Sequence, residues 1–477
     1  MRVWLGFACA AGPARQALCQ TPEPLLLRQD TMDLRIRLDY PNERLIGVAR
    51  LAITNGSAGP VRSVPLLLNR LLSVRKVTEW SGRELPFRER VVRFSDEPKL
   101  QVEFVEVALP RALRPGDRTG LVVHYEGNLV GYVETGSLYI RDHVDTAFTI
   151  LRADAYAFPV IGRPSRALNR AVPWLPFTFH AELTVPEGFV AVTGGRRLAK
   201  RPSAEGVTWE YGSDVAVPFL NIAIARYVEV GQRRVRAFVF PEDSAVAQGT
   251  VSQAEAALDS LTAWFGPLGD APHVTLIEIP PGYGSQASLS AGIIMDAAAF
   301  REAARRHELY HELAHFWNPR DTAVPSPRVT EGLATLLEQS LATALDGWHG
   351  LDSLAEARAA RLVARSASDS LLRTVPMRDY GRVDRTGYSY SVGMLLFYLL
   401  ERCVGRPAFF TLWGEYLRQT RTTGGSDQAF ADFAITRTGS PAVRELFTTW
   451  WLTTRWIDRL RAGEPFRALG AGCSAPG

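Results

Sequence analysis

The stretch RRHELYHELAHFWNPR, residues 305–320, contains the pattern His-Glu-x-x-His twice. One copy runs from His307 to His311 and the other from His311 to His315, so the copies share a histidine. Residues four apart on a helix are rotated by only about 40°, and all three histidines therefore fall near one stripe. A zinc site takes one set of ligands and one general base, so only one copy can supply the ligands and the base. Helical geometry alone leaves the register open.

The segment after these histidines offers a third metal ligand. Catalytic zinc usually holds three protein side chains and keeps one position for water. Glu331, in VTEGLATLLE, begins a second helical pattern, and the stretch NPRDTAVPSPR before it is rich in turn residues that can reverse the chain. Two antiparallel helices can then present His311, His315 and Glu331 to one ion. The pair His307 and His311 stays physically possible, with a gap four residues longer.

Length and composition describe a multidomain globular chain. The 477 residues suggest two or three domains, and 46% hydrophobic with 22% charged residues is ordinary for a soluble protein. The formal net charge is only +4, and the Lys and Arg residues are scattered, which argues against nucleic acid as the partner. No apolar run approaches the roughly 18 residues of a membrane-spanning segment.

The hydrophobic pattern changes along the chain. Residues 31–232 read as short strands separated by turns, beginning with DLRIRLDY, and predict an antiparallel β domain. Residues 233–460 contain long apolar stretches at helical spacing that end at glycine, which predicts a mainly helical domain. Residues 461–477 read as a loose tail.

Residues 1–30 read as a leader or a possible signal segment. One basic residue, a short apolar stretch and small residues after it could form a minimal secretory signal, and the alternative is a frayed leader or a misassigned start. If residues 1–11 act as a signal peptide the protein is secreted or periplasmic, and otherwise it is cytoplasmic. The widely spaced cysteines match no metal-binding pattern and imply no disulfide framework: they are Cys9, Cys19, Cys403 and Cys473.

The sequence HELAHFW at 311–317, followed by TEGLA at 330–334, resembles the aminopeptidase N family of zinc metallopeptidases, which are gluzincins. The motif of that family is His-Glu-x-x-His-x-Trp and then Asn-Glu-Gly-Phe-Ala. Trp317, two residues after His315, reproduces the ending, whereas nothing comparable follows His311. The resemblance therefore favours the later register.

The resemblance also implies roles for individual residues. Glu312 matches the general base, and GYSYSVGMLLFYLLE places Tyr390 at the position of the catalytic tyrosine, with Tyr388 as the alternative. The match gives one Zn²⁺ with three protein ligands: His311, His315 and Glu331.

Most of the chain takes part in the resemblance. Residues 180–195 are similar to the N-terminal β domain of the family, and residues 428–451 are similar to the end of its catalytic domain. The expected fold is an α+β multidomain protein, with an N-terminal antiparallel β-sandwich or saddle domain before a thermolysin-like, mainly helical catalytic domain. The large C-terminal helical domain of many members is missing, so the chain would be a short form.

Two departures from the family pattern concern specificity. The commonest family spacing leaves eighteen residues before the third ligand, and fifteen lie between His315 and Glu331 here. The Gly-x-Met-Glu-Asn segment, whose glutamate binds the substrate amine in the family, is replaced by GYGSQASLSAGIIMD, where Gln286 is the nearest polar equivalent. This replacement puts strict aminopeptidase specificity in doubt. The run HFWNPR also resembles the glycyl aminopeptidases, although its flanking segments fit that group less well.

The predicted function is hydrolysis of N-terminal bonds in short peptides by zinc-activated water, with Glu312 as general base. A tyrosine hydroxyl such as that of Tyr390 is suited to stabilising the oxyanion. One alternative is an endopeptidase or other hydrolase that uses the same site without needing a free amine. Another is a non-catalytic binding module that retains the fold. The sequence predicts neither a side-chain preference nor an oligomeric state.

Overall fold

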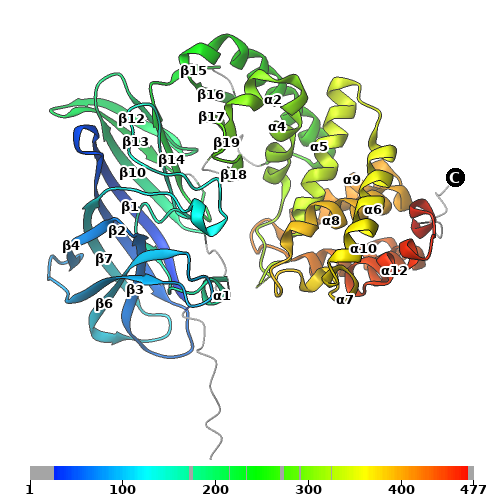
Figure 1. Cartoon of the computed structure of the whole chain (residues 1–477), viewed down its shortest axis with the longest axis horizontal. Coiled ribbons are helices and arrows are strands. Elements are labelled where there is room, and N and C mark those ends of the chain that lie inside the picture. The colour runs from blue at the N-terminus through cyan, green and yellow to red at the C-terminus, as the bar shows by residue number, and fades with distance from the viewer. Residues whose placement is uncertain are drawn as a thin grey trace, which may run out of the picture.

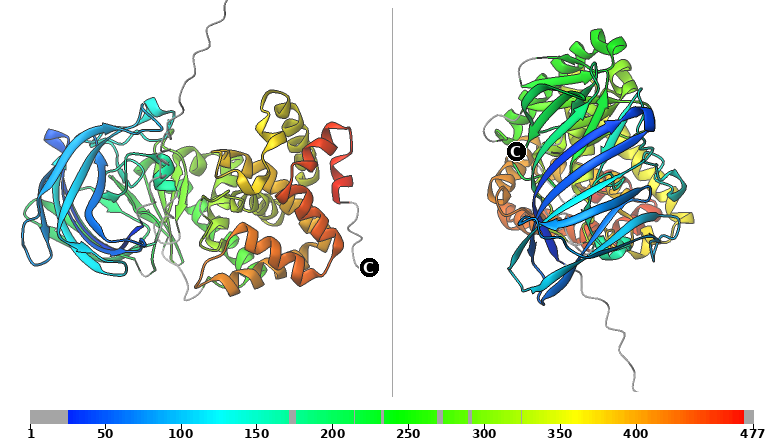
Figure 2. Two further views of the ribbon diagram at one scale, coloured as in Figure 1. Left: turned by 90° about the horizontal axis from the view of Figure 1, so that it is seen from below. Right: turned by 90° about the vertical axis from the view of Figure 1, so that its left-hand side faces the viewer.

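The chain folds into a β domain, a smaller sheet beside it and a cluster of helices at the opposite end of the long axis (Figures 1 and 2). This architecture confirms the predicted fold class, an antiparallel β domain followed by a mainly helical domain. The computed structural model describes residues 26–170, 176–213, 215–231, 234–268, 273–288, 292–323 and 325–470.

A seven-stranded sheet is the largest sheet of the β domain. In the first strand of the chain, Leu34, Ile36 and Leu38 are buried while the residues between them are not, which is the alternation of a strand with one face toward the core. Neighbouring strands are antiparallel except for β1 and β10. In sheet order the strands are β12 (Arg196–Ser203), β13 (Gly206–Gly212), β10 (Thr178–Val185), β1 (Leu27–Asp39), β2 (Arg44–Asn55), β7 (Arg118–Gly127) and β4 (Leu72–Glu79).

Two smaller sheets complete the β domain. The four-stranded sheet shares a core with the large sheet, in which Leu66 and Val105 join Leu34 and Leu51. Its strands in order are β5 (Phe87–Arg93), β6 (Gln101–Leu113), β3 (Val61–Asn69) and β9 (Val160–Ile161). The three-stranded sheet consists of β11 (Val190–Val192), β14 (Asn221–Ala225) and β8 (Thr149–Arg152).

A five-stranded sheet lies between the β domain and the helices (Figure 1). Ile150 and Val192 of the β domain pack against Ile277 and Ile294 of this sheet, which joins the two parts by an apolar contact. The short strand β18 is an edge, paired antiparallel to β19. The strands in order are β15 (Val228–Val230), β16 (Val235–Val239), β17 (Val274–Ile279), β19 (Gly292–Asp296) and β18 (Gln286–Ser288).

The helical part is built around α5 and α8. A Cβ atom on Gly332 would lie 2.4 Å from the backbone of Gly393, so only glycine lets the two helices approach this closely. The longer helices are α2 (Ser244–Phe265), α4 (Arg306–Ala314), α5 (Thr330–Asp346), α6 (Leu351–Ser368), α8 (Ser389–Val404), α9 (Arg406–Thr420) and α10 (Asp427–Thr438). The shorter ones are α1 (Arg166–Arg170), α3 (Ala297–Arg301), α7 (Leu371–Thr374), α11 (Pro441–Phe447) and α12 (Arg455–Arg461).

Both ends of the chain differ in part from their expected character. Residues 27–30, within the predicted leader, belong to strand β1. Residues 461–470, within the predicted tail, pack Phe466 and Leu469 into the helical core. The signal-peptide prediction falls on residues outside the described part of the chain. Cys403, at the end of α8, is disulfide-bonded, although the cysteine spacing implies no disulfide framework.

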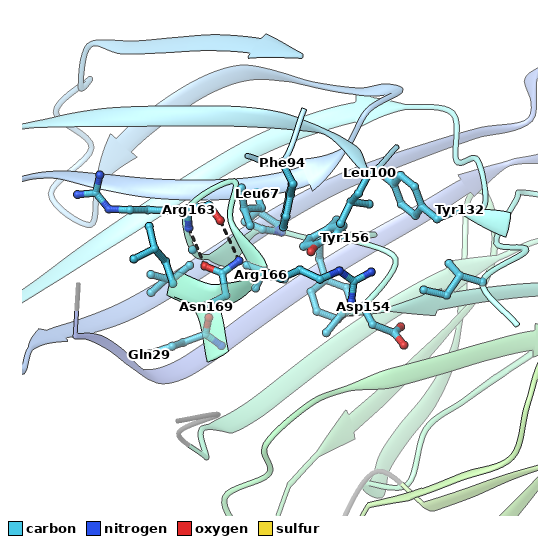
Figure 3. Close-up of a pocket in the computed structure, with 18 of the residues that line it drawn as sticks. Gln29, Leu67, Phe94, Leu100, Tyr132, Asp154, Tyr156, Arg163, Arg166 and Asn169 are labelled. Atoms are coloured by element: carbon cyan, nitrogen blue, oxygen red, sulfur yellow. Dashed lines mark hydrogen bonds between the residues drawn. The ribbon is translucent and has the colours of Figure 1, made fainter. Parts of the chain in front are cut away.

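The β domain contains a cavity of about 300 Å³, lined largely by aromatic and aliphatic side chains such as Phe94, Tyr132 and Tyr156 (Figure 3). Residues of α1 and the preceding loop add polar groups to its lining, among them Arg166 and Asn169. None of the candidate site residues lines this cavity. Among the described helices, none combines the length and apolar character that a membrane span requires.

Candidate active site

Helix α4 and the turn after it carry three of the candidate residues. The sequence RHELYHELA is rich in good helix formers, and Leu309, Tyr310 and Leu313 bury one face of the helix. After one 3₁₀ turn (η5, His315–Trp317) the chain becomes extended at Asn318, because the following residue is proline. The indole nitrogen of Trp317 donates to the carbonyl of Gly266 at 3.0 Å, which anchors this turn.

The first turn of α5 brings Glu331 to the same place. Its Oε2 atom lies 3.4 Å from Nε2 of His311 and 3.3 Å from Nε2 of His315. One ligand atom from each of these residues lies within 4.8 Å of the others. Glu331 is only 5% exposed. The structure therefore brings together the three side chains that the sequence proposes as metal ligands.

The donor set fits zinc. Two imidazole nitrogens and one carboxylate oxygen are a ligand combination that catalytic Zn²⁺ uses. Nδ1 of His311 lies 2.9 Å from Oε2 of Glu338, so this carboxylate can hold a proton on Nδ1 and leave Nε2 for a metal ion. A carboxylate behind a ligating histidine is the usual support of such a ligand.

The side chain of Asn318 contacts the same ring nitrogen of His315. Its Nδ2 lies 2.9 Å from Nδ1 of His315, while its Oδ1 is buried without a hydrogen-bond partner. The amide oxygen and nitrogen have the same shape, and with the two exchanged Nδ1–H of His315 donates to Oδ1 and leaves Nε2 for a metal ion.

The electrostatics of the cluster favour a cation. Burial lowers the pKa of His311, but the carboxylates of Glu331 and Glu338 outweigh burial and raise it to about 10. Burial raises the pKa of Glu331, but its hydrogen bonds with His311 and His315 dominate and hold it well below its usual range. Positive charge at these side chains is therefore strongly stabilised. A divalent cation brings more positive charge to them than a proton does.

Glu312 lies beside the cluster on α4. Its side chain is buried, and burial raises its pKa, although the nearby histidines act in the opposite direction. The backbone N–H of Ala287 in β18 donates to its carboxylate, which ties Glu312 to the edge strand. A carboxylate with a raised pKa, next to a candidate metal site, is suited to accepting and returning a proton.

Of the two tyrosines that the sequence leaves open, Tyr390 lies at the cluster. Its ring is nearly parallel to that of His311, with centroids 5.8 Å apart, and its hydroxyl forms a hydrogen bond with Glu331. Burial raises its pKa, so the hydroxyl keeps its proton as a donor. Tyr388 instead donates to Asp369 at 2.5 Å, away from the cluster.

Gln286 lies on the edge strand β18, where its Oε1 accepts a hydrogen bond from Asn221 of β14 at 3.1 Å. Its acceptor atom is therefore already engaged by the β domain. His307 is exposed and contacts the carbonyl of Ala304, apart from the cluster. Glu308 pairs with Arg305 at 2.6 Å and accepts from Ser285.

Sequence reasoning missed three residues around the cluster. Glu338 lies seven positions after Glu331, two turns along the same helix face, so helical periodicity could have suggested it. Asn318 had no comparable signal. Arg328, whose Nη2 donates to Oε1 of Glu331, lies three residues before it in an irregular segment.

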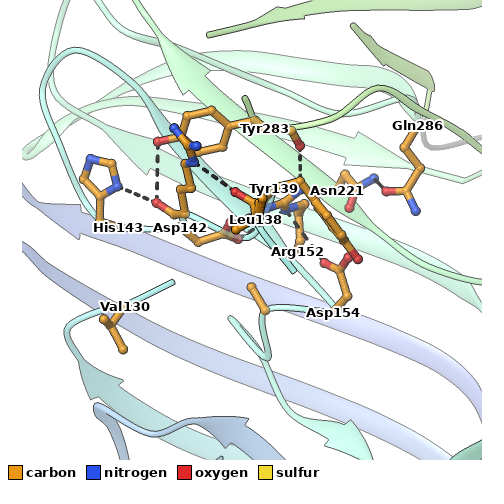
Figure 4. A network of polar contacts seen from close by, with 12 residues as sticks. Val130, Leu138, Tyr139, Asp142, His143, Arg152, Asp154, Asn221, Tyr283 and Gln286 are labelled. Carbon is orange, nitrogen blue, oxygen red and sulfur yellow. Dashed lines mark hydrogen bonds and ion pairs between the residues drawn. The ribbon is translucent and has the colours of Figure 1, made fainter. Parts of the chain in front are cut away.

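A buried ion pair holds the β domain against the edge strand (Figure 4). Arg152 of β8 is 1% exposed and donates to Asp142 at 2.5 Å, to the carbonyl of Tyr139 at 2.8 Å and to the carbonyl of Tyr283 at 3.1 Å. Tyr283 lies in the loop that leads into β18. The network therefore fixes the strand that carries Gln286 and contacts Glu312.

Comparisons with known proteins give a likeness in structure only. No protein-family model and no curated protein sequence matches the chain. The M1 zinc metallopeptidase from Deinococcus radiodurans is similar with a TM-score of 0.64 and 22% identity, over 90% of this chain and 94% of that chain. A Glu-to-Ala mutant of M1 zinc metallopeptidase from Deinococcus radiodurans, bound to a Tyr-Ser-Ala substrate, gives the same values. A two-domain M1 zinc metallopeptidase mutant bound to L-arginine is similar at 0.63 and 22%, over 88% and 93% of the two chains. At this identity the chain shares the fold of these M1 zinc metallopeptidases.

Proposed function

We propose that the protein is a zinc-dependent metallopeptidase that hydrolyses the N-terminal bond of short peptides. The observation that carries the proposal is the convergence of His311, His315 and Glu331, with ligand atoms within 4.8 Å of one another and with Glu312 beside them. The fold shared with M1 zinc metallopeptidases supports it.

In this proposal each side chain has one task. His311, His315 and Glu331 would hold the zinc ion, which when bound acidifies water and polarises a carbonyl group. Glu312 takes a proton from the attacking water and returns it to the leaving amine. The hydroxyl of Tyr390 donates to the oxygen that becomes negative as water adds to the scissile carbonyl.

A second candidate is hydrolysis that needs no free amine on the substrate. It is favoured by the edge strand β18, whose residues Gln286, Ala287 and Ser288 include no carboxylate to pair with an ammonium group. The Oε1 atom of Gln286 is held by Asn221. An endopeptidase or another amide hydrolase would fit this strand.

The deciding experiment measures hydrolysis by zinc-loaded protein of aminoacyl amides and of the same compounds with acetylated amines. Cleavage of the free-amine set alone supports the aminopeptidase, and cleavage of the acetylated set supports the second candidate. If neither set is cleaved while zinc is bound, the proposed activity is contradicted and a binding role is favoured. The Glu312→Gln variant serves as the control for contaminating peptidases.

A further inference from the structure

Arg328 places a cation beside the candidate metal cluster. Its Nη2 donates to Oε1 of Glu331, while Oε2 of the same carboxylate faces His311 and His315. The guanidinium is therefore one carboxylate away from the atoms that would hold the metal. Its side chain keeps 53% of its surface exposed, so a ligand in solution can reach it.

The backbone at Arg328 is held in a conformation that non-glycine residues rarely adopt. Its φ of 57° lies in the left-handed region. The N–H of Arg328 donates to Oγ of Ser326 at 2.9 Å, and the carbonyl of Pro327 accepts from Ser389 of α8 at 2.6 Å. Neighbouring groups thus impose the conformation, and imposed strain of this kind is concentrated at functional positions.

The guanidinium of Arg328 has more donors than Glu331 uses. It carries five N–H groups in a planar fork, and the hydrogen bond to Glu331 comes from Nη2 alone. Tyr139 and Tyr390 lie close enough for electrostatic interaction with it. Because Tyr390 is the proposed donor to the scissile carbonyl, a substrate bound there has Arg328 within the same neighbourhood.

Neither α4 nor β18 offers a free carboxylate to a substrate. Strand β18 contains no acidic residue, and Glu308 of α4 is held by Arg305 and Ser285. Glu312 is buried and faces the backbone of Ala287. These two elements therefore offer no free anion to a substrate ammonium, whereas Arg328 offers a cation to a substrate carboxylate.

We propose that Arg328 binds a carboxylate of the substrate close to the scissile amide, which would make peptides with such a carboxylate the preferred substrates. The proposal rests on the proposed peptidase function. The carboxylate can belong to an acidic side chain next to the cleaved bond or to the free C-terminus of a dipeptide. Both present the planar pair of oxygens that a guanidinium fork matches.

The test compares kcat/KM of zinc-loaded protein within matched pairs. Leu-Ala against Leu-Ala-NH₂ reports the terminal carboxylate, and Glu-Ala-NH₂ against Gln-Ala-NH₂ and Leu-Glu-NH₂ against Leu-Gln-NH₂ report side chains on either side of the bond. We expect the carboxylate member to be better by about ten-fold or more in at least one pair, as for a charge-assisted hydrogen bond. Which pair responds identifies the source.

Variants separate binding from support of Glu331. In Arg328→Gln the ratio within the responding pair should fall to about one, and Arg328→Lys should keep part of it because the charge remains. Arg320→Gln is the matched control, since Arg320 is exposed in the same connecting segment and donates to the carbonyl of Thr423. It should leave the ratio unchanged. Equal rates within every wild-type pair, or a ratio that survives Arg328→Gln, would overturn the proposal.

Calorimetric binding of the same pairs to zinc-loaded Glu312→Gln protein gives a readout independent of turnover. Tighter binding of the carboxylate member, lost when Arg328→Gln is added, supports the role of Arg328 even if wild-type protein hydrolyses nothing, and only the peptidase function then fails. Hydrolysis without discrimination in rate or binding leaves the peptidase and removes the role of Arg328. Zinc content measured on every variant shows whether a loss follows from metal release.

Discussion

Two buried polar clusters in this protein distribute their charges in opposite ways. In the β domain, Arg152 points its donors at the acceptors of Asp142, Tyr139 and Tyr283, while Oδ1 of the neighbouring Asp154, 3.7 Å from Nε, makes no hydrogen bond with a described residue. In the helical part, His311 and His315 both direct Nε2 at one oxygen of Glu331. The first cluster carries its own cation. The second becomes a convergence of acceptors when its histidines are neutral and Glu338 accepts the Nδ1 proton of His311.

The difference is the one expected between a structural cluster and a metal-binding one. Converging lone pairs repel one another in a buried site unless a cation or a proton lies between them. Matched donors and acceptors need no added charge, and their cost of burial is offset by hydrogen bonds. Substitutions in the two clusters should therefore respond differently to zinc.

Glu331→Gln should have the largest effect. The amide removes the negative charge that the two histidines face, so we expect the bound zinc to be lost from freshly purified protein. Hydrolysis should fall by more than the ~10²–10⁴-fold that general-base catalysis contributes. Atomic absorption of the purified variant measures the zinc. Full zinc occupancy in Glu331→Gln would contradict the ligand assignment.

Glu312→Gln should separate chemistry from metal binding. The amide cannot take a proton, so kcat should fall by about 10²–10⁴-fold while zinc content is unchanged. His307→Gln is the control, because His307 lies apart from the cluster and should change neither quantity. Loss of zinc in the His307 variant would instead revive the earlier His-Glu-x-x-His register.

Tyr390→Phe tests the oxyanion donor. Loss of one such hydroxyl typically lowers kcat by about 10²–10³-fold, and the zinc content and KM should change little. Tyr388→Phe is a closely matched control, two residues away and bonded to Asp369. Equal effects of the two substitutions would indicate a packing role for both tyrosines.

The sequence predicts the three candidate metal ligands but not the residues that surround them. Helical period and one turn-rich segment predict that two histidines of α4 lie near Glu331, because these contacts are made within one pair of neighbouring helices. The choice of His311 and His315 comes from the resemblance of HELAHFW to the aminopeptidase N motif. The choice between Tyr390 and Tyr388 depends on where α8 begins and how closely Gly332 lets it approach α5. That is a property of packing, which periodicity does not specify.

Residues on the edge strand show a second kind of limit. The partner of Gln286 is Asn221, which comes from a different sheet and lies far away in the sequence. The contacts of Arg152 likewise depend on how a β-domain loop meets the loop before β18. No local pattern signals such pairs, since each half reads as an ordinary polar residue of a strand or a loop.

Glu338→Gln tests the support of one ligand without removing any ligand. Its carboxylate fixes the proton on Nδ1 of His311, and loss of such support typically weakens zinc binding by about 10–100-fold. Competition with a chelator of known affinity measures the change. Unchanged zinc affinity would mean that the orientation of His311 comes from helix packing alone.

Arg152→Met should have the smallest effect on zinc affinity and the largest on folding. Removing one partner of a buried ion pair leaves Asp142 uncompensated and typically costs about 3–5 kcal/mol in the free energy of unfolding. Urea unfolding followed in the β domain measures this loss, and Arg152→Met with Asp142→Leu should recover part of it, because Asp142 is then no longer left as a buried charge without its partner. Zinc affinity should stay near that of wild type, since the network contacts the loop before β18 rather than the ligands. If Arg152→Met weakened zinc binding as much as Glu338→Gln, the two clusters would be one coupled unit. The distinction between a cluster that carries its own cation and one that needs an added cation would then no longer describe this protein.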